Sequence, residues 1–436
     1  MERHFKIKGQ RPLSGKVRIS GAKNSVLSLL IASTMTNEVV QLEDVPNIQD
    51  VNILIDILKY LNANVISTPN LQNNTVTIDC ANLDYKDLLI DEITKFRASY
   101  YFMGAFVARF KKCSLYLPGG CNLGPRPIDL HIMGLEKLGC KIVQEDQGDR
   151  TVMQITCPDG LKGADIFLDF PSVGATMNLI LAATLAEGET KIENAACEPE
   201  IVDLATLLNN MGANIKGAGT DEIRITGVEK LSGTQHQVIP DRIEAGSYLM
   251  IGALLSDNLK IENIIPEHLE ALTSKLLNMG FNLQINDDSI NIGKTDLDSL
   301  KPVNIKTGVF PSFPTDLQQI FVTLTTQVKG ESEIIETIYP ERFKQCEYLK
   351  AMGASIDVNC KESQSKITVS GKTPLVGFDV ESTDLRAGAS LVLAGLIASG
   401  ETRVFKIDHI LRGYDNLINK LLEIGAEIEL IEEWDE

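Results

Sequence analysis

The sequence lacks the features that mark several large classes of protein. Its 436 residues contain no apolar run near the roughly 20 residues of a membrane-spanning helix, and the first residues, MERHFKIK, have no apolar signal core. The eight cysteines include no CxxC pair, and the five histidines form no HxxxH or HExxH pattern. We therefore expect a cytoplasmic protein with reduced thiols and with no metal site or cofactor.

Positive charge is also scarce. Lys and Arg number 41 against 59 Asp and Glu, which gives a net charge of −18. Such a charge argues against nucleic acid and anionic membranes as partners. An anionic small molecule would have to be held by a local cluster of Lys and Arg. The apolar fraction of 44% is that of an ordinary globular protein, and the length allows two domains.

One phrase recurs along the chain: an apolar helix end, a turn residue and a strand. It reads LKYLNANV, LEKLGCKI, LLNNMGANI, LLNMGFNL, YLKAMGASI and LLEIGAEI, with the turn at Asn62, Gly139, Gly212, Gly280, Gly353 and Gly425. The intervals of 77, 73, 68, 73 and 72 residues indicate six units of similar length. Gly directly after an apolar-periodic helix predicts a left-handed helix cap.

Each unit reads as β-α-β-α-β-β, so the fold class is α/β (α+β). The last unit lacks its final strand, and the N-terminal strand at 5–9 is expected to supply it. Three units would form one domain at 22–236, and three would form the other at 237–436 together with 1–21. Two chain crossings between them would make a natural hinge. The expected first helices include 175–185 and 387–398, and the expected strands include 191–193, 333–336 and 402–405.

The first helices of the units start with charged residues. A helix start carries free N–H groups and a positive dipole end, so an acid there is ordinarily a cap. That interpretation applies to Asp241, Asp316 and Asp384. A cation opposes the dipole, and such cations occur at Lys23, Arg97, Arg242 and Arg386. Their equivalent places suggest groups aimed at one anionic ligand, although a surface residue or a structural ion pair explains any single one of them.

The turn before the second helix is altered in two of the six repeats. In the second repeat it is LPGGCNLGPRP, in which Gly and Pro surround Cys121 and Arg126. In the sixth repeat the corresponding turn carries Arg412. Neighbouring cations lower a thiol pKa, so Cys121 is suited to act as a general acid or nucleophile. A Cys–His protease arrangement has only weak support, since no His lies beside Cys121 in sequence. The remaining cysteines are expected to be small buried hydrophobes.

The motifs LPGGCNLGPRPIDL and SGAKN resemble those of the UDP-N-acetylglucosamine 1-carboxyvinyltransferase family, the enolpyruvyl transferases that open peptidoglycan synthesis. The resemblance extends in order along essentially the whole chain, through PSVGAT, PDRI, FPTD, STDLR and RGY. It implies a two-domain inside-out α/β barrel. It also implies transfer of enolpyruvyl from phosphoenolpyruvate to the 3′-hydroxyl of UDP-N-acetylglucosamine, with release of phosphate, through a tetrahedral ketal.

The resemblance also implies roles for individual residues. Cys121 would protonate the phosphoenolpyruvate methylene, form a covalent adduct there and be the target of fosfomycin, and Asp316 would take the proton of the sugar hydroxyl. Phosphoenolpyruvate would be held by Lys23, Arg126 and Arg412, with Arg386 nearby. The residues expected to bind substrate are Lys23, Asn24, Arg97, Arg126, Pro127, Ile128, Asp129, Leu130, Ser172, Val173, Asp316, Ile338, Asp384, Arg386 and Arg412. Domain closure would bring Arg412 toward the Cys121 loop.

Three alternatives stay open at this point. A duplicated repeat scaffold without chemistry would explain the periodicity alone. The shikimate-pathway enolpyruvyl transferase shares the six-repeat fold, but it has no use for Cys121. An idle paralogue that senses a sugar nucleotide would be expected to have lost Cys121 or Asp316, and both are present. One departure from the family pattern is Met177, at a position where an acid is common, and it suggests a paralogue rather than lost function.

Overall fold

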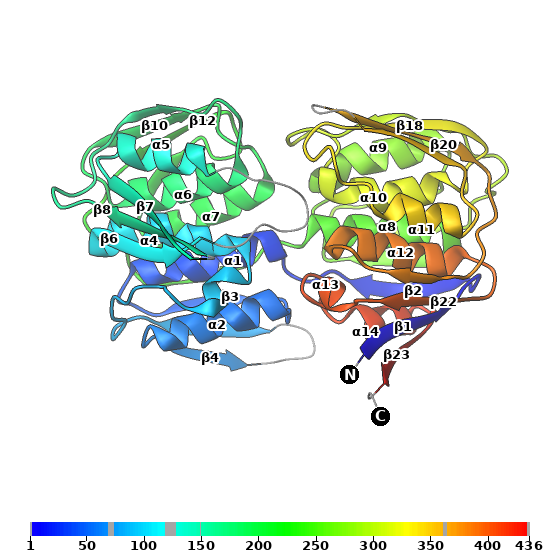
Figure 1. Cartoon of the computed structure of the whole chain (residues 1–436), viewed down its shortest axis with the longest axis horizontal. Helices are drawn as coiled ribbons and strands as arrows, with labels where there is room; N and C mark the ends of the chain where they lie inside the picture. The colour runs from blue at the N-terminus through cyan, green and yellow to red at the C-terminus, as the bar shows by residue number, and fades with distance from the viewer. Residues whose placement is uncertain (1, 69–73, 118–127, 149, 361–363, 434–436) are drawn as a thin grey trace. The chain divides into compact units, whose positions relative to one another are not determined.

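The computed structural model describes residues 2–68, 74–117, 128–148, 150–360 and 364–433, and these form two compact units (Figure 1). The first unit runs from Gly21 to Ile239. The second unit contains the chain up to Ser20 and again from Pro240 onward. Within the described residues, no helix is long and apolar enough to cross a membrane.

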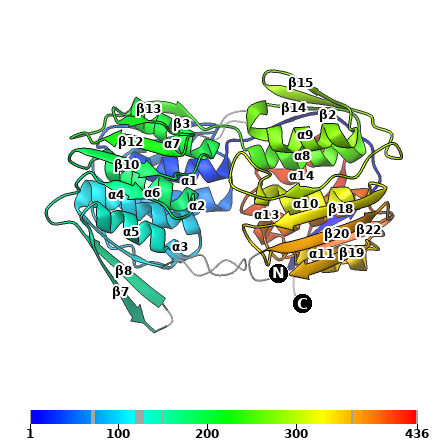
Figure 2. The same cartoon turned by 90° about the horizontal axis from the view of Figure 1, so that it is seen from above.

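The first unit carries three sheets, with strand orders β13-β3-β5-β4, β6-β8-β7 and β11-β12-β10-β9. Its strands are β3 (Val40–Glu43), β4 (Asn64–Thr68), β5 (Thr75–Asp79), β6 (Lys112–Tyr116), β7 (Lys141–Gln147), β8 (Arg150–Thr156), β9 (Asp165–Phe167), β10 (Glu189–Glu193), β11 (Asn214–Lys216), β12 (Glu222–Thr226) and β13 (Thr234–Gln237). Its helices are α1 (Lys23–Ala32), η1 (Ser33–Met35), α2 (Gln49–Tyr60), α3 (Asp91–Thr94), η2 (Arg97–Tyr100), α4 (Tyr101–Phe110), α5 (Asp129–Lys137), α6 (Val173–Thr184) and α7 (Pro199–Asn210). Strands β7 and β8 form a hairpin that extends away from the helices of this unit (Figure 2).

The second unit also carries three sheets, with strand orders β15-β16-β14-β2, β17-β18-β20-β19 and β21-β22-β1-β23. Its strands are β1 (Glu2–Lys8), β2 (Leu13–Arg18), β14 (Ser256–Glu262), β15 (Leu283–Ile285), β16 (Ser289–Gly293), β17 (Ile305–Lys306), β18 (Gly330–Glu336), β19 (Ile356–Cys360), β20 (Ser365–Gly371), β21 (Asp379–Glu381), β22 (Glu401–Phe405) and β23 (Glu427–Glu433). Its helices are α8 (Arg242–Leu255), η3 (Pro266–Leu269), α9 (Glu270–Met279), α10 (Thr315–Thr325), α11 (Gln345–Ala351), α12 (Leu385–Ile397), α13 (Asp408–Leu411) and α14 (Leu417–Glu423).

The repeat predicted from the sequence is present. The order β9-α6-β10-α7-β11-β12 follows β-α-β-α-β-β, with β9 and β10 parallel and β12 returning antiparallel. All six turn residues have positive φ, from 65° at Asn62 to 109° at Gly353, which confirms the left-handed helix caps. Strand β1 pairs with both β22 and β23, so the N-terminal strand completes the last repeat as predicted.

The two chain crossings exchange strands between repeats. Strand β2 precedes α1 in the chain, yet it pairs in parallel with β14, the strand that follows α8. Conversely, β13 precedes α8 and pairs in parallel with β3, the strand that follows α1. Each unit thus completes its sheets with a strand whose own chain continues into the other unit.

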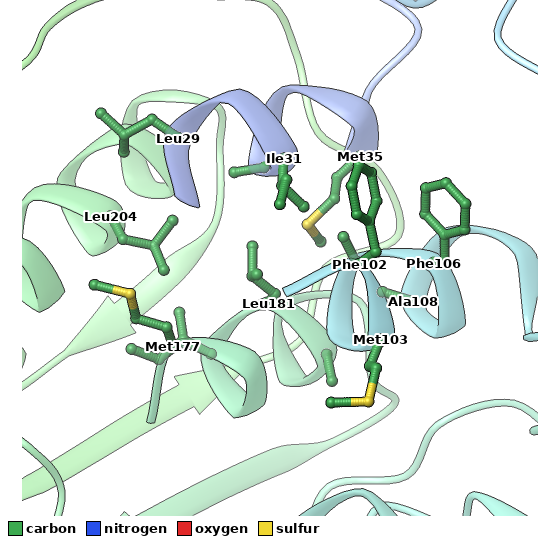
Figure 3. Packing of buried hydrophobic residues seen from close by; sticks show 14 of the residues in the cluster. Leu29, Ile31, Met35, Phe102, Met103, Phe106, Ala108, Met177, Leu181 and Leu204 are labelled. Carbon is green, nitrogen blue, oxygen red and sulfur yellow. The ribbon is translucent and has the colours of Figure 1, made fainter. Parts of the chain in front are cut away.

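Within each unit the first helices of the repeats lie inside and the sheets lie outside them (Figure 1, Figure 2). The first helix of each repeat is buried along most of its length, and such a helix is apolar all round rather than amphipathic. In the first unit, side chains of α1, α4, α6 and α7 meet in one core, among them Leu29, Phe102, Leu181 and Leu204 (Figure 3).

Candidate active site

Lys23 is the first residue of α1, as its place in the repeat predicted. Its ammonium Nζ lies 2.8 Å from Oδ2 of Asp50, near the start of α2, and the two side chains are only 14% and 5% exposed. A cation at a helix start opposes the dipole, and this carboxylate offsets part of that cost. Asn24 follows it with an exposed side chain.

Arg97 begins η2, and its guanidinium lies over the ring of Tyr100 at 5.7 Å from the centroid. The carbonyl of Tyr100 accepts a hydrogen bond from the Asn178 side-chain amide at 2.8 Å. The amide oxygen of Asn178 accepts from the backbone N–H of Gly104 at 2.6 Å. That bond fixes which end of the amide is nitrogen, so Asn178 donates to Nδ1 of His131, 2.8 Å away.

His131 is therefore held as the tautomer that carries its proton on Nε2. Burial, together with the nearby charge of Arg97, lowers the pKa of His131 to about 4. Its Nε2 edge faces Gly174, next to the predicted binding residues Ser172 and Val173, where a Cβ on Gly174 would lie 3.1 Å from Nε2. Ser172 caps α6 by accepting the N–H of Ala175. Sequence reasoning missed His131, although it directly follows the quoted PIDL motif.

The predicted residues Ile128, Asp129 and Leu130 lie at the start of α5. Asp129 is exposed, and the other two side chains are half-buried. Cys121, Arg126 and Pro127, which include two of the proposed catalytic groups, lie outside the described residues.

Asp316 forms the clearest charged cluster of the second unit. Its Oδ1 lies 2.7 Å from Nη1 of Arg342, and its Oδ2 lies 3.5 Å from Nη2 of Arg386. The two arginine side chains are 3% and 6% exposed, whereas that of Asp316 is 28% exposed. The carboxylate of Asp316 is thus partly accessible to solvent, whereas the two guanidinium groups that pair with it are shielded from solvent.

The surroundings of Asp316 hold it deprotonated. Burial alone would raise its pKa, but the charge of Arg342, the charge of Arg386, the hydrogen bond from Arg342 and the charge of Arg242 lower the pKa well below its ordinary value. The guanidinium of Arg386 also lies over the ring of Tyr414, 5.6 Å from the centroid. Of the cations in this cluster, Arg342 was not singled out from the sequence.

The ordinary interpretation of an acid at a helix start, that it caps the helix, does not hold for Asp316. Asp241 accepts the N–H groups of Ile243 and Glu244, and Asp384 accepts those of Arg386 and Ala387, so both are helix caps. Helix α10 begins at Thr315, so Asp316 already lies inside the helix and its carboxylate turns to Arg342. The acid that departs from the capping pattern is the one expected to act as the base.

Arg412 and Ile338 lie in turns of the second unit. Arg412 follows the last residue of α13 and is half-buried. Ile338 is half-buried in the turn after β18, where its backbone N–H is bound by the carboxylate of Glu336. Within the described residues, no cluster of three or more His, Cys, Asp and Glu side chains is placed to hold a metal ion.

The expectation that the remaining cysteines are buried is correct for most of those described. Cys80, Cys113, Cys140, Cys157 and Cys346 are buried, and burial raises the pKa of Cys80 to about 12. Cys197 is only half-buried, and Cys360, at the end of strand β19, is exposed, so the expectation is wrong for these two.

Comparisons with known proteins cover nearly the whole chain. The family model described as EPSP synthase (3-phosphoshikimate 1-carboxyvinyltransferase) matches residues 7–421. The chain is 48% identical over 427 residues to UDP-N-acetylglucosamine 1-carboxyvinyltransferase 2 of Lactococcus lactis, covering 98% of this chain and 99% of the relative. It is 49% identical over 422 residues to the protein of that name from Listeria monocytogenes, covering 97% and 96%.

Solved structures agree with the fold. The enolpyruvyl transferase NikO from Streptomyces tendae superposes with a TM-score of 0.87 at 25% identity, over 98% of this chain and 99% of that one. EPSP synthase from Acinetobacter baumannii gives a TM-score of 0.73 at 18% identity, over 99% and 100%, which supports the fold alone.

Proposed function

Because this chain belongs to the enolpyruvyl transferase family, we propose that it transfers the enolpyruvyl group of phosphoenolpyruvate to the 3′-hydroxyl of UDP-N-acetylglucosamine and releases phosphate. The observation that carries the choice of acceptor is the near-full-length identity of 48% to relatives named for that reaction. The reaction would be the first committed step of peptidoglycan synthesis, in the cytoplasm, and would serve cell wall formation.

Asp316 suits the role of the base that accepts the proton of the sugar hydroxyl. A carboxylate beside two guanidinium groups stays deprotonated at neutral pH, but it is a weak base. An anionic substrate that takes up part of the charge of Arg386 would leave Asp316 less neutralised, and its basicity would rise when both substrates are bound. The partly accessible carboxylate and the shielded arginines fit this order of events.

The proposed chemistry is an addition followed by an elimination. As Asp316 accepts the hydroxyl proton, the sugar oxygen bonds to C2 of phosphoenolpyruvate, and the Cys121 thiol gives its proton to C3. The double bond thereby becomes a methyl group on a tetrahedral ketal. Loss of one methyl proton and of phosphate from C2 then restores the double bond in the product.

Phosphoenolpyruvate carries several negative charges, so its binding to a chain of net charge −18 needs clustered cations. We assign this role to Lys23, Arg126 and Arg412, with Arg386 nearby. Lys23 is already paired with Asp50, so the phosphate would share or replace that carboxylate. The sugar nucleotide would contact Asn24, Arg97, Arg126, Pro127, Ile128, Asp129, Leu130, Ser172, Val173, Asp316 and Ile338. Asp384 is a further predicted substrate-binding residue.

The test is phosphate release from phosphoenolpyruvate by the purified protein with each of two acceptors. We expect release with UDP-N-acetylglucosamine and none above background with 3-phosphoshikimate. Release with the second acceptor alone would transfer the assignment to the shikimate reaction. Binding of UDP-N-acetylglucosamine without release under any condition would support a sensor instead of an enzyme.

A further inference from the structure

The turn after the strand that lies between the two helices of a repeat differs in one repeat. In the described turns of four repeats, the residue after the strand has a left-handed backbone: Asp44, Asn194, Asn263 and Lys406, with φ of 54° to 58°. At the same place in the fifth repeat, Thr337 has a negative φ. The preceding Glu differs too, since Glu43, Glu193 and Glu262 are half-exposed whereas Glu336 is 0% exposed.

The turn of the fifth repeat is held by the buried carboxylate of Glu336. Its Oε1 accepts the backbone N–H groups of Ile338 at 2.7 Å and Tyr339 at 3.1 Å. The same oxygen accepts the hydroxyl of Thr307 at 2.7 Å. Thr337 is fastened to Thr307 by two further bonds, of 3.0 and 2.8 Å. One carboxylate oxygen therefore shapes the segment that carries Ile338.

The other carboxylate oxygen of Glu336 faces the Asp316 cluster. Oε2 accepts the hydroxyl of Thr315 at 2.9 Å, and the oxygen of Thr315 in turn accepts Nη1 of Arg342 at 3.1 Å. The same Nη1 donates to Asp316. Because the hydroxyl of Thr315 donates its proton to Glu336, the lone pairs of the Thr315 oxygen accept the hydrogen bond from Arg342 and orient it.

A second path leads from Glu336 to the same arginine. Tyr339, whose N–H is bound by Glu336, places its ring against the guanidinium of Arg342, 5.5 Å from centroid to Cζ. The Nε of Arg342 donates to Gln319 at 3.2 Å, so most of the guanidinium is fixed by neighbours. A guanidinium held this way meets the carboxylate of Asp316 in one orientation.

We propose that Glu336 is a positioning residue that sets the Ile338 turn and the Arg342–Asp316 pair together, and so couples the shape of the sugar-nucleotide site to the orientation of the base. The assignment of Ile338 and Asp316 to that site rests on the function proposed above. The coupling itself rests on the hydrogen bonds that the buried carboxylate of Glu336 accepts. In the four described turns with a left-handed residue, the side chain at the end of the preceding strand accepts no backbone N–H of its own turn.

The experiment compares Glu336→Gln with Glu262→Gln, the equivalent surface residue of the fourth repeat, which forms ion pairs with Lys16 and Lys260. Glu336→Gln keeps one acceptor oxygen but presents an amide N–H₂ group to Thr315, which removes the acceptor for the Thr315 proton. We expect kcat/KM for UDP-N-acetylglucosamine to fall about 10- to 100-fold. Glu262→Gln should remain within about twofold of wild type.

A matched pair at Thr315 covers the case in which Glu336→Gln fails to fold. Thr315→Ser keeps the hydroxyl between Glu336 and Arg342 and should retain activity near wild type. Thr315→Val removes it, and we expect a fall similar to that of Glu336→Gln, with the double variant no worse than either single one. In Thr315→Val and Glu336→Gln the acid limb of the pH profile should also move upward, because Arg342 would then neutralise Asp316 less well beside Arg386 and Arg242.

Amide hydrogen exchange separates this inference from the proposed function. The N–H groups of Ile338 and Tyr339 should be protected in wild type and should exchange at least about tenfold faster in Glu336→Ala, whether or not the protein transfers enolpyruvyl. If the wild-type protein releases no phosphate but the exchange pattern is as expected, only the proposed function is contradicted. Unchanged exchange in Glu336→Ala, or wild-type kcat/KM in both Glu336→Gln and Thr315→Val, would overturn the positioning role.

Discussion

Nη1 of Arg342 lies 2.7 Å from Oδ1 of Asp316, and the bond joins residues 26 positions apart in the chain. The guanidinium is shielded, so its charge acts on the carboxylate with little screening from solvent. This pair explains how Asp316, which we propose as the base, stays deprotonated before substrate arrives.

Replacement of this arginine should move the pH dependence of the reaction. Burial opposes ionisation of Asp316, and Arg342, Arg386 and Arg242 lower its pKa, so Arg342→Gln should raise that pKa. The carboxylate would then be protonated at higher pH, and the acid limb of kcat/KM should shift upward by a similar amount. The measurement is a pH–rate profile of both proteins from the acid side to neutrality.

The control for this profile is Arg403→Gln. Arg403 makes a two-bond ion pair with Asp379 in the same unit, but both side chains are about half exposed. Its loss should leave the acid limb where it is in wild type. If the acid limb stays in place after Arg342→Gln, the group that titrates in that limb is not Asp316.

Cys121→Ser should cripple turnover and abolish labelling by fosfomycin. A serine hydroxyl is a far weaker acid than a thiol, so the proton for the phosphoenolpyruvate methylene would be lost, at a cost of about 10²- to 10⁴-fold in kcat. Cys121→Asp should retain part of the activity, since a carboxylic acid also supplies a proton. The measurements are phosphate release and the mass of the labelled protein.

Cys360→Ser is the matched control, because Cys360 is an exposed thiol at the end of β19. It should react with a general thiol reagent in the native protein, yet its replacement should change neither turnover nor fosfomycin labelling. Fosfomycin labelling that persists in Cys121→Ser would refute the assignment of the general acid.

Local sequence signals predicted the repeat frame well. The turn at Gly212 needed only the apolar helix before it and the strand after it, and both are contiguous in the chain. The N-terminal strand was placed in the last repeat because that repeat was one strand short. Such features depend on backbone propensity and periodicity, which are determined by residues close together in the sequence.

The charged clusters could be predicted only in part. Lys23 and Arg386 stood out because a cation at a helix start opposes the dipole. Arg342 and Glu336 gave no such signal, because their roles arise from contacts with α10 that the chain forms only after folding. His131 was missed for the same reason, since its tautomer is set by Asn178 on another helix.

Met177 should prove to be a packing residue and not part of the chemistry. Its side chain is 0% exposed on α6 and belongs to the core of the first unit (Figure 3). Met177→Ala should lower the free energy of unfolding by about 2–5 kcal/mol, whereas Met177→Leu should cost less than about 1.5 kcal/mol. Both variants should keep the kcat of wild type at a temperature where they are folded, and a kcat loss in the leucine variant would argue for a catalytic role.

His131 should make the protein less stable as the pH falls below neutrality. Its pKa is lowered from 6.5 to about 4, first by burial and then by the charge of Arg97. Between these two values the unfolded chain binds a proton on this residue and the folded chain does not, so stability falls as the pH is lowered from 6.5 to 4. The loss from this one group would be on the order of 3 kcal/mol over the whole window.

Replacement by Gln removes the titrating group but keeps an acceptor for the amide of Asn178, which now donates to Nδ1. Denaturant unfolding at several pH values should therefore show a shallower dependence between pH 6.5 and 4 in His131→Gln than in wild type. Nitrogen chemical shifts of the imidazole should show a neutral ring with its proton on Nε2 at pH 5. A ring that is charged at that pH, or equal slopes in the two proteins, would exclude the buried neutral His131 described above.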